Sequence, residues 1–169
     1  MPSQRHEQAA QLLGLFVTRL AEELETPYEP LGMTTWKMPG AAKGLEADQC
    51  YYIQHHAVAR EKEILDLETD PPPDLAVEVD ITSSSLDRMG IYGEMRVPEV
   101  WRYDGRAMTI YYLAEDTTEI EASLYVEQET SAALPMLTAQ LLTEMIERMR
   151  NEGELKALLA FDEWLQSQK

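Results

Sequence analysis

Acidic side chains gather on one face of a single predicted strand in the middle of the chain. In the segment LAVEVDI (75–81), side chains alternate faces with period two, so the apolar residues share one face. Glu78 and Asp80 then lie on the opposite face, together with Asp74 just before the strand. Neighbouring carboxylates repel one another unless they are solvated, protonated or bridged by a cation. The pattern is typical of either a divalent-cation site or an exposed acidic strand.

A further acid lies at the start of the β-prone segment 47–54. On a strand there, Asp48 shares a face with Glu46, and pairing with the acidic strand would bring both toward Glu78. An oxygen-rich cluster of this kind suits Mg²⁺ or Mn²⁺, which bind through one or two carboxylates together with water and a substrate phosphate. Spacing alone leaves open that these acids are only exposed.

Other side chains that could do chemistry have simpler interpretations. Ser84, followed three residues later by Asp87, is typical of a capping box that opens a helix, with a nucleophilic serine as the alternative. His55 and His56 are adjacent, so on a strand they would point to opposite faces and could not chelate together. Cys50 is expected to be a small buried hydrophobe.

The elements that must position these residues form an α/β pattern. Apolar positions at helical spacing predict an amphipathic helix over 4–25, which prolines end. We expect one domain over residues 1–169, with C-terminal helices at about 138–167. The predicted strands are 31–37, 47–54, 64–67, 75–81, 99–104, 108–114 and 119–127, and the later predicted helices are 84–95, 138–150 and 153–167.

The charge of the chain argues against a role in coating nucleic acid. There are 14 Lys and Arg against 31 Asp and Glu, a net charge of −17, whereas contacts to phosphate need a basic footprint. Residues 45–87 are strongly acidic, while 88–106 contain four arginines. Either the acids are a solvated surface, or an acidic block surrounds a divalent cation and the arginine stretch faces an anion.

Cysteine count and hydropathy bear on where the protein works. A single cysteine forbids an internal disulfide, which fits a reducing compartment. No apolar run approaches the roughly 20 residues that span a bilayer, and the N-terminus has no cleavage site of the A-x-A kind. We therefore expect a cytoplasmic protein without a membrane partner.

Three segments together resemble those of a known family. GLEADQCYYI (44–53), PPPDLAVEVDITSSSLDR (71–88) and IYGEMRVPEVWRYD (91–104) are similar to segments of small bacterial restriction-endonuclease-like proteins. These proteins belong to the PD-(D/E)xK nuclease superfamily, and the resemblance extends over about residues 31–167. It implies a restriction-endonuclease-like core, a mixed β-sheet flanked by helices with the site at one sheet edge. Members typically hydrolyse phosphodiester bonds with Mg²⁺.

The resemblance assigns roles residue by residue. It places the first-motif aspartate at Asp48 and the acid of the third motif at Glu78, which implies that these two bind the metal. The usual lysine position is held by Asp80, and the family's displaced cation falls on Arg88 in the following helix. Asp74 also matches a family position, with a role either in the site or in shaping the entry to the strand.

Some positions depart from the family pattern or are assigned only by location. Ala47 stands where a proline usually precedes the first aspartate, and Arg96 stands where a glycine is usual. A helix glutamate often completes such a site, and Glu22 or Glu23 are the candidates here.

The sequence therefore predicts a Mg²⁺- or Mn²⁺-dependent nuclease that acts on nucleic acid, with DNA favoured over RNA as the substrate. The alternative is a catalytically degenerate relative that serves as an interaction or structural module. It is motivated by the acidic charge, Ala47, and the lack of a lysine at the site. An acidic mimic of nucleic acid is disfavoured because Asp48 and Glu78 fit the family pattern. A homodimer is left open by analogy with related nucleases.

Overall fold

The computed structural model describes residues 3–37, 44–81, 84, 88–114 and 124–169. The helices in these ranges are α1 (Gln4–Glu23), α2 (His56–Glu61), α3 (Met89–Glu94), α4 (Ala139–Glu152) and α5 (Glu154–Ser167). The strands are β1 (Glu29–Pro30), β2 (Thr35–Trp36), β3 (Leu45–Glu46), β4 (Gln49–Tyr52), β5 (Leu75–Val79), β6 (Glu99–Tyr103), β7 (Met108–Leu113) and β8 (Tyr125–Gln128).

The described strands form one mixed sheet and one small hairpin. The sheet has the order β1-β4-β5-β6-β7-β8, and β2 pairs separately with β3. Within it, β5 and β6 run parallel while the other neighbouring strands are antiparallel. The fold is therefore α/β with a mixed sheet flanked by helices, as the sequence predicts. The β5–α3–β6 crossover sets the two central strands side by side.

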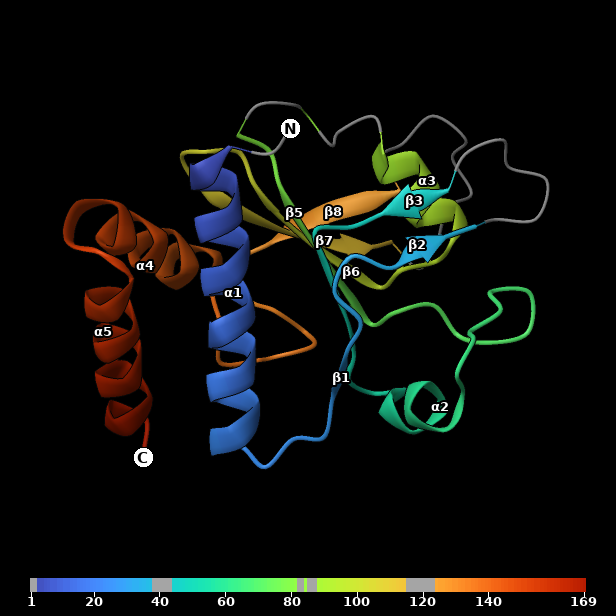
Figure 1. The fold of residues 1–169 in the computed structure, drawn as a ribbon, viewed down its shortest axis with the longest axis horizontal. Coiled ribbons are helices and arrows are strands. Elements are labelled where there is room, and N and C mark those ends of the chain that lie inside the picture. Colours follow the sequence, from blue (N-terminus) through green and yellow to red (C-terminus); the bar gives the residue numbers. More distant parts are fainter. Residues whose placement is uncertain (1–2, 38–43, 82–83, 85–87, 115–123) are drawn as a thin grey trace.

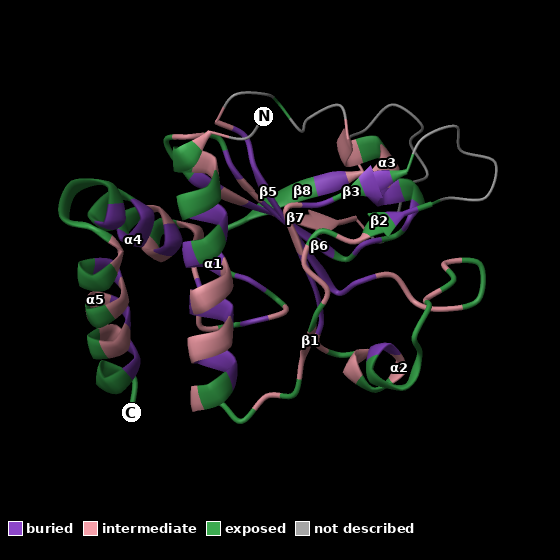
Figure 2. Ribbon diagram, in the orientation of Figure 1, coloured by how far each residue is buried: buried purple, intermediate pink, exposed green. Residues whose placement is uncertain are grey.

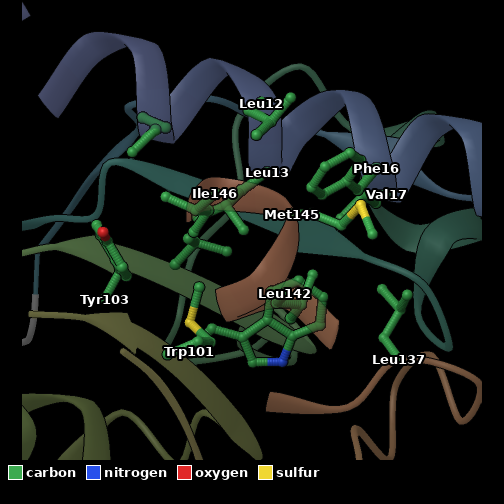
Figure 3. Close-up of a cluster of buried hydrophobic side chains, with 14 of the residues drawn as sticks. Leu12, Leu13, Phe16, Val17, Trp101, Tyr103, Leu137, Leu142, Met145 and Ile146 are labelled. Atoms are coloured by element: carbon green, nitrogen blue, oxygen red, sulfur yellow. The ribbon is translucent and has the colours of Figure 1, made fainter. Parts of the chain in front are cut away.

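One face of the sheet carries the larger hydrophobic core. Helix α1 packs there with α4 and α5, and its apolar stripe is fully buried (Figures 1 and 2). Side chains of α1 and α4 meet Trp101 and Tyr103 of β6 (Figure 3). Phe16 of α1 stacks on Phe161 of α5 with ring centroids 4.3 Å apart. This core fixes α1 across the strands that carry the acidic residues.

The opposite face carries a second core beneath α3 and the β2–β3 hairpin. It contains Cys50, Ala76 and Tyr92, whereas Leu75 and Val77 lie in the first core. The predicted alternation of β5 is therefore confirmed, and all five of its residues are buried because helices cover both faces.

The end of α3 gives position 96 a backbone conformation that favours glycine. Val97 N donates to Tyr92 O and Arg96 N donates to Gly93 O, both at 3.0 Å, which is the Schellman pattern. Arg96 consequently has φ of +60°, a left-handed conformation that favours glycine. The arginine therefore closes the helix at a steric cost, and the turn still delivers the chain to β6.

Several predicted boundaries differ from the structure. Helix α1 and the two C-terminal helices are confirmed to within a few residues. Residues 64–67 lie in a loop and form no strand. Pro30, one of the prolines that follow the first helix, lies on the edge strand β1 and pairs with Tyr51 of β4, a position where proline is tolerated. The capping box needs Asp87, which lies outside the described residues.

None of the helices in the described ranges is long and apolar enough to cross a bilayer.

We expect the single thiol of the chain to be unreactive while the protein is folded. Cys50 is 1% exposed, and burial raises the pKa of its thiol to about 11. At about pH 8 almost none is thiolate, the reactive form. Titration with a disulfide reagent such as DTNB should modify Cys50 only after denaturant is added. Rapid release of one equivalent from the folded protein would contradict this packing.

Candidate functional site

Glu78 lies at the centre of the candidate site and is fully buried on β5. The Tyr92 hydroxyl of α3 donates a hydrogen bond to Glu78 Oε1, and Arg88 Nη2 donates to Oε2 at 2.7 Å. Burial raises the pKa of this carboxyl to about 7, although both hydrogen-bond donors oppose the shift. The charges of Asp48 and Asp80 raise the pKa further. The ionised form of Glu78 therefore depends on the two hydrogen-bond donors, because burial favours the neutral form.

Asp48 lies beside Glu78 because of the register between β4 and β5. Gln49 pairs with Val77, so the residue before Gln49 falls next to the end of β5. Val79 N donates to Asp48 Oδ2 at 2.7 Å, which ties this carboxylate to the strand that carries Glu78. The structure thus brings together the two acids that the sequence predicts as metal ligands.

His6 from α1 also reaches this point. Its Nε2 lies 3.1 Å from Asp48 Oδ1, and its side chain is 13% exposed. Sequence analysis did not identify this residue, since one histidine in the polar first turn of a helix gives no pattern. The predicted helix glutamates lie at the other end of α1, where Glu23 pairs with Lys169. The first turn of the helix, rather than its last, therefore faces the site.

Asp80 is paired with an arginine from the neighbouring strand. Arg102 Nε donates to Asp80 Oδ2 at 2.5 Å, and both side chains are largely buried. Arg102 is also the register partner of Glu78 in the parallel β5–β6 pair. The acid at the family's lysine position thus has its own counter-charge, which only the strand register could reveal.

Asp74 lies at the opposite end of β5 and is not brought to the other acids. Its Oδ2 accepts hydrogen bonds from Ile53 N at 2.7 Å and from His55 N at 3.0 Å. Its Oδ1 lies 2.8 Å from His55 Nδ1. These contacts fix the chain after β4, so the structure favours the shaping role among the two predicted for Asp74.

Glu99 is a second buried acid that sequence analysis missed. It opens β6 and is 1% exposed. It accepts hydrogen bonds from Trp101 Nε1, Ser131 Oγ, Ala132 N and Ala133 N at 2.5–3.0 Å. All of these donors belong to β6 or to the loop before α4. Glu99 therefore anchors that loop and has no place in the Glu78 cluster.

The residues present fit a hard divalent cation bound partly by water and substrate. Asp48 and Glu78 supply carboxylate oxygens, each of which can accept more than the single hydrogen bond seen here. The charges of Asp48 and Asp80 add to the effect of burial in raising the pKa of Glu78, and a bound cation would offset these two charges. Within the described ranges, no three His, Cys, Asp or Glu side chains converge closely enough to hold a metal alone. Mg²⁺ commonly keeps several waters and takes only one or two carboxylates.

Comparison with known proteins places this geometry in a family. The Uma2 family, described as "Putative restriction endonuclease", matches residues 1–146. The chain belongs to the Uma2 family. The match covers every residue of the cluster around Glu78, and it agrees with the resemblance seen in the sequence. No match is found among curated proteins.

A solved structure shows the same fold in another protein. The crystal structure of a "putative nuclease belonging to DUF820" from Anabaena variabilis ATCC 29413 aligns with a TM-score of 0.57 at 11% identity. The alignment covers 86% of this chain and 84% of that one. This likeness shows the fold, and membership of the Uma2 family supports a nuclease-type function.

The raised pKa of Glu78 predicts a pH-dependent stability difference between the wild type and Glu78→Gln. Because the pKa is about 7 when folded and 4.5 ordinarily, the folded state binds this proton more tightly. The stabilisation is complete below about pH 4.5 and is lost as the pH rises through 7. In a chelating buffer, the unfolding free energy of the variant minus that of the wild type should rise across this window by up to about 3 kcal/mol.

Urea denaturation at several pH values measures this difference. Glu127→Gln, an exposed change on β8, is the matched control and should show no such slope. A constant difference between Glu78→Gln and the wild type would show that Glu78 is not the titrating group.

Asp74→Asn separates a shaping role from a metal-binding role. An asparagine keeps one acceptor oxygen but loses the negative charge that strengthens the hydrogen bonds from Ile53 N and His55 N, so we expect the free energy of unfolding to fall by about 1–3 kcal/mol. Mn²⁺ affinity, measured by calorimetry on the folded variant, should not change. Lost affinity with stability intact would place Asp74 in the site.

Proposed function

We propose that the chain is a metal-dependent endonuclease that hydrolyses phosphodiester bonds, with DNA as the first substrate to test. Asp48 and Glu78 are the proposed ligands of Mg²⁺ or Mn²⁺, Arg88 is the cation that faces the phosphate, and Asp80 is an auxiliary acid. The observation that supports this most is the meeting of Asp48, Glu78 and Arg88 at one end of β5.

The residues of the proposed site have two roles: some bind the cation, and one offsets negative charge on the phosphate. A divalent cation supplies polarisation of a phosphoryl oxygen and a lowered pKa of bound water. Glu78 and Asp48 hold the charge that binds it, and Tyr92 fixes the Glu78 carboxylate through its hydroxyl. Arg88 places a guanidinium at the edge of the cluster, where it can offset charge that develops on the phosphate.

Arg88 cannot replace every property of a lysine. Its guanidinium stays protonated, so it can stabilise an anion but cannot accept a proton. A neighbouring backbone contact, Arg88 Nη1 to Glu46 O at 3.2 Å, holds it close to Glu78. The proposed enzyme is therefore expected to be slower than one with a lysine at this point.

A catalytically degenerate interaction module is the second candidate. The net charge of −17 disfavours tight binding to a phosphate backbone, and Asp80 stands where the family has a lysine. These features, with Ala47 in place of proline, are what favour it.

Cleavage and metal binding by matched variants test the proposal. With Mg²⁺ or Mn²⁺ and a supercoiled plasmid or single-stranded DNA as substrate, Glu78→Gln should lower cleavage by more than about 100-fold, because it removes a metal ligand. Arg88→Lys should raise cleavage, because lysine can lose a proton. Glu127→Gln should match the wild type.

Two outcomes would contradict the proposed nuclease site. If the wild type neither cleaves these substrates nor binds Mn²⁺ in calorimetry, the interaction module is the better account. If cleavage persists unchanged in Glu78→Gln, a contaminating nuclease or another site is responsible, and the proposed site is wrong.

A further inference from the structure

Both ring nitrogens of His6 face carboxylate oxygens. Nε2 lies 3.1 Å from Asp48 Oδ1, and Nδ1 lies 3.2 Å from Glu7 Oε1. Ser3 caps α1, and its Oγ accepts a hydrogen bond from His6 N at 3.2 Å. The first turn of the helix therefore holds the imidazole between an exposed acid and the candidate metal ligand.

This arrangement restricts what can lie between His6 and Asp48. A neutral imidazole carries one N–H, so it can donate to only one of two facing carboxylates. At the other nitrogen, a lone pair would face an oxygen lone pair at close range. Either both nitrogens donate, or Nδ1 donates to Glu7 while Nε2 and Asp48 share a cation. The second arrangement, a carboxylate behind a metal-bound histidine, is common at metal sites.

The separation of the two atoms suits a shared cation. Ligands bound at about 2.1 Å on adjacent corners of an octahedron lie about 3.0 Å apart. The 3.1 Å between His6 Nε2 and Asp48 Oδ1 is close to that value without movement of either side chain. Glu78, the other proposed ligand, does not converge with these two in the described structure and has to approach them to bind the same ion. A cavity of about 440 Å³ lined by both residues opens beside them, which gives a cation and its waters access.

We propose that His6 is a ligand, together with Asp48, of the divalent cation used by the proposed nuclease, and that Glu7 orients it from behind. This inference rests on the proposed function. A nitrogen ligand disfavours Mg²⁺, which takes oxygen ligands, relative to first-row transition ions that accept imidazole. The site should therefore bind Mn²⁺ or Co²⁺ in preference to Mg²⁺.

Pulsed electron paramagnetic resonance of the Mn²⁺-loaded full chain tests the ligand directly. Nitrogen coupled to Mn²⁺ should be detected in the wild type, and the signal should change when histidine is labelled with ¹⁵N. The coupling should be absent in His6→Gln and retained in His56→Gln, a matched change in α2. The chain has three histidines, so these variants with His55→Gln assign the signal.

Calorimetry adds a second readout. Mn²⁺ and Co²⁺ affinity should fall by about 10- to 100-fold in His6→Gln, whereas Mg²⁺ affinity should change much less. If His6→Gln fails to fold, histidine coupling that persists in both His55→Gln and His56→Gln assigns the ligand to His6.

The outcomes separate this inference from the function on which it rests. Mn²⁺ binding that depends on Glu78 but shows no histidine coupling would overturn the role of His6 and leave the proposed nuclease intact. Coupling that persists in His6→Gln would assign the ion to another histidine and overturn the inference. No Mn²⁺ binding by the wild type would overturn both the inference and the proposed metal site.

Discussion

The burial of the Glu78 carboxylate is the constraint on which the rest of the site depends. An ionised carboxyl removed from water costs several kcal/mol unless it is paired and hydrogen-bonded. The donors that offset this cost, Arg88 and Tyr92, come from the segment that crosses from β5 to β6. That segment must therefore dock on the second core, and the left-handed turn at Arg96 ends its helix where β6 has to begin.

Each acid at this end of β5 meets a basic side chain from a different element. Carboxylates this close would repel one another if they were left unpaired. Distributing their partners ties α1, α3 and β6 to the strands that carry the acids, so the charges also position the elements. A strongly acidic chain can in this way hold several carboxylates close together. The pairs are His6 with Asp48, Arg88 with Glu78, and Arg102 with Asp80.

The parts of the site that follow from local pattern could be predicted from the sequence, and those that follow from register could not. The alternation of LAVEVDI predicts the face on which Glu78 lies, and the motif spacing predicts that Asp48 meets it. The pairing of Asp80 with Arg102 needs the parallel register of β5 and β6, which no local pattern encodes. His6 needs the angle at which α1 crosses the sheet, which the packing of α4 and α5 sets. The predicted strand at 64–67 was wrong because apolar residues there cover the second core from a loop.

The acid at position 80, where the resemblance implies a lysine, has a physical consequence for how the proposed site could work. Asp80 stands at the position where the resemblance implies a lysine. Arg102 pairs with Asp80, so an acid at this position adds no uncompensated negative charge. Arg88 restores a cation near Glu78 and yet offers no group that can take a proton. In the proposed enzyme, ionisation of an attacking water would then rely on the acidity that a bound cation would confer, and this differs among divalent ions. A histidine ligand that favours transition-metal ions would then matter for the reaction itself. It would select the cations that lower the pKa of bound water enough for the site to work without a lysine.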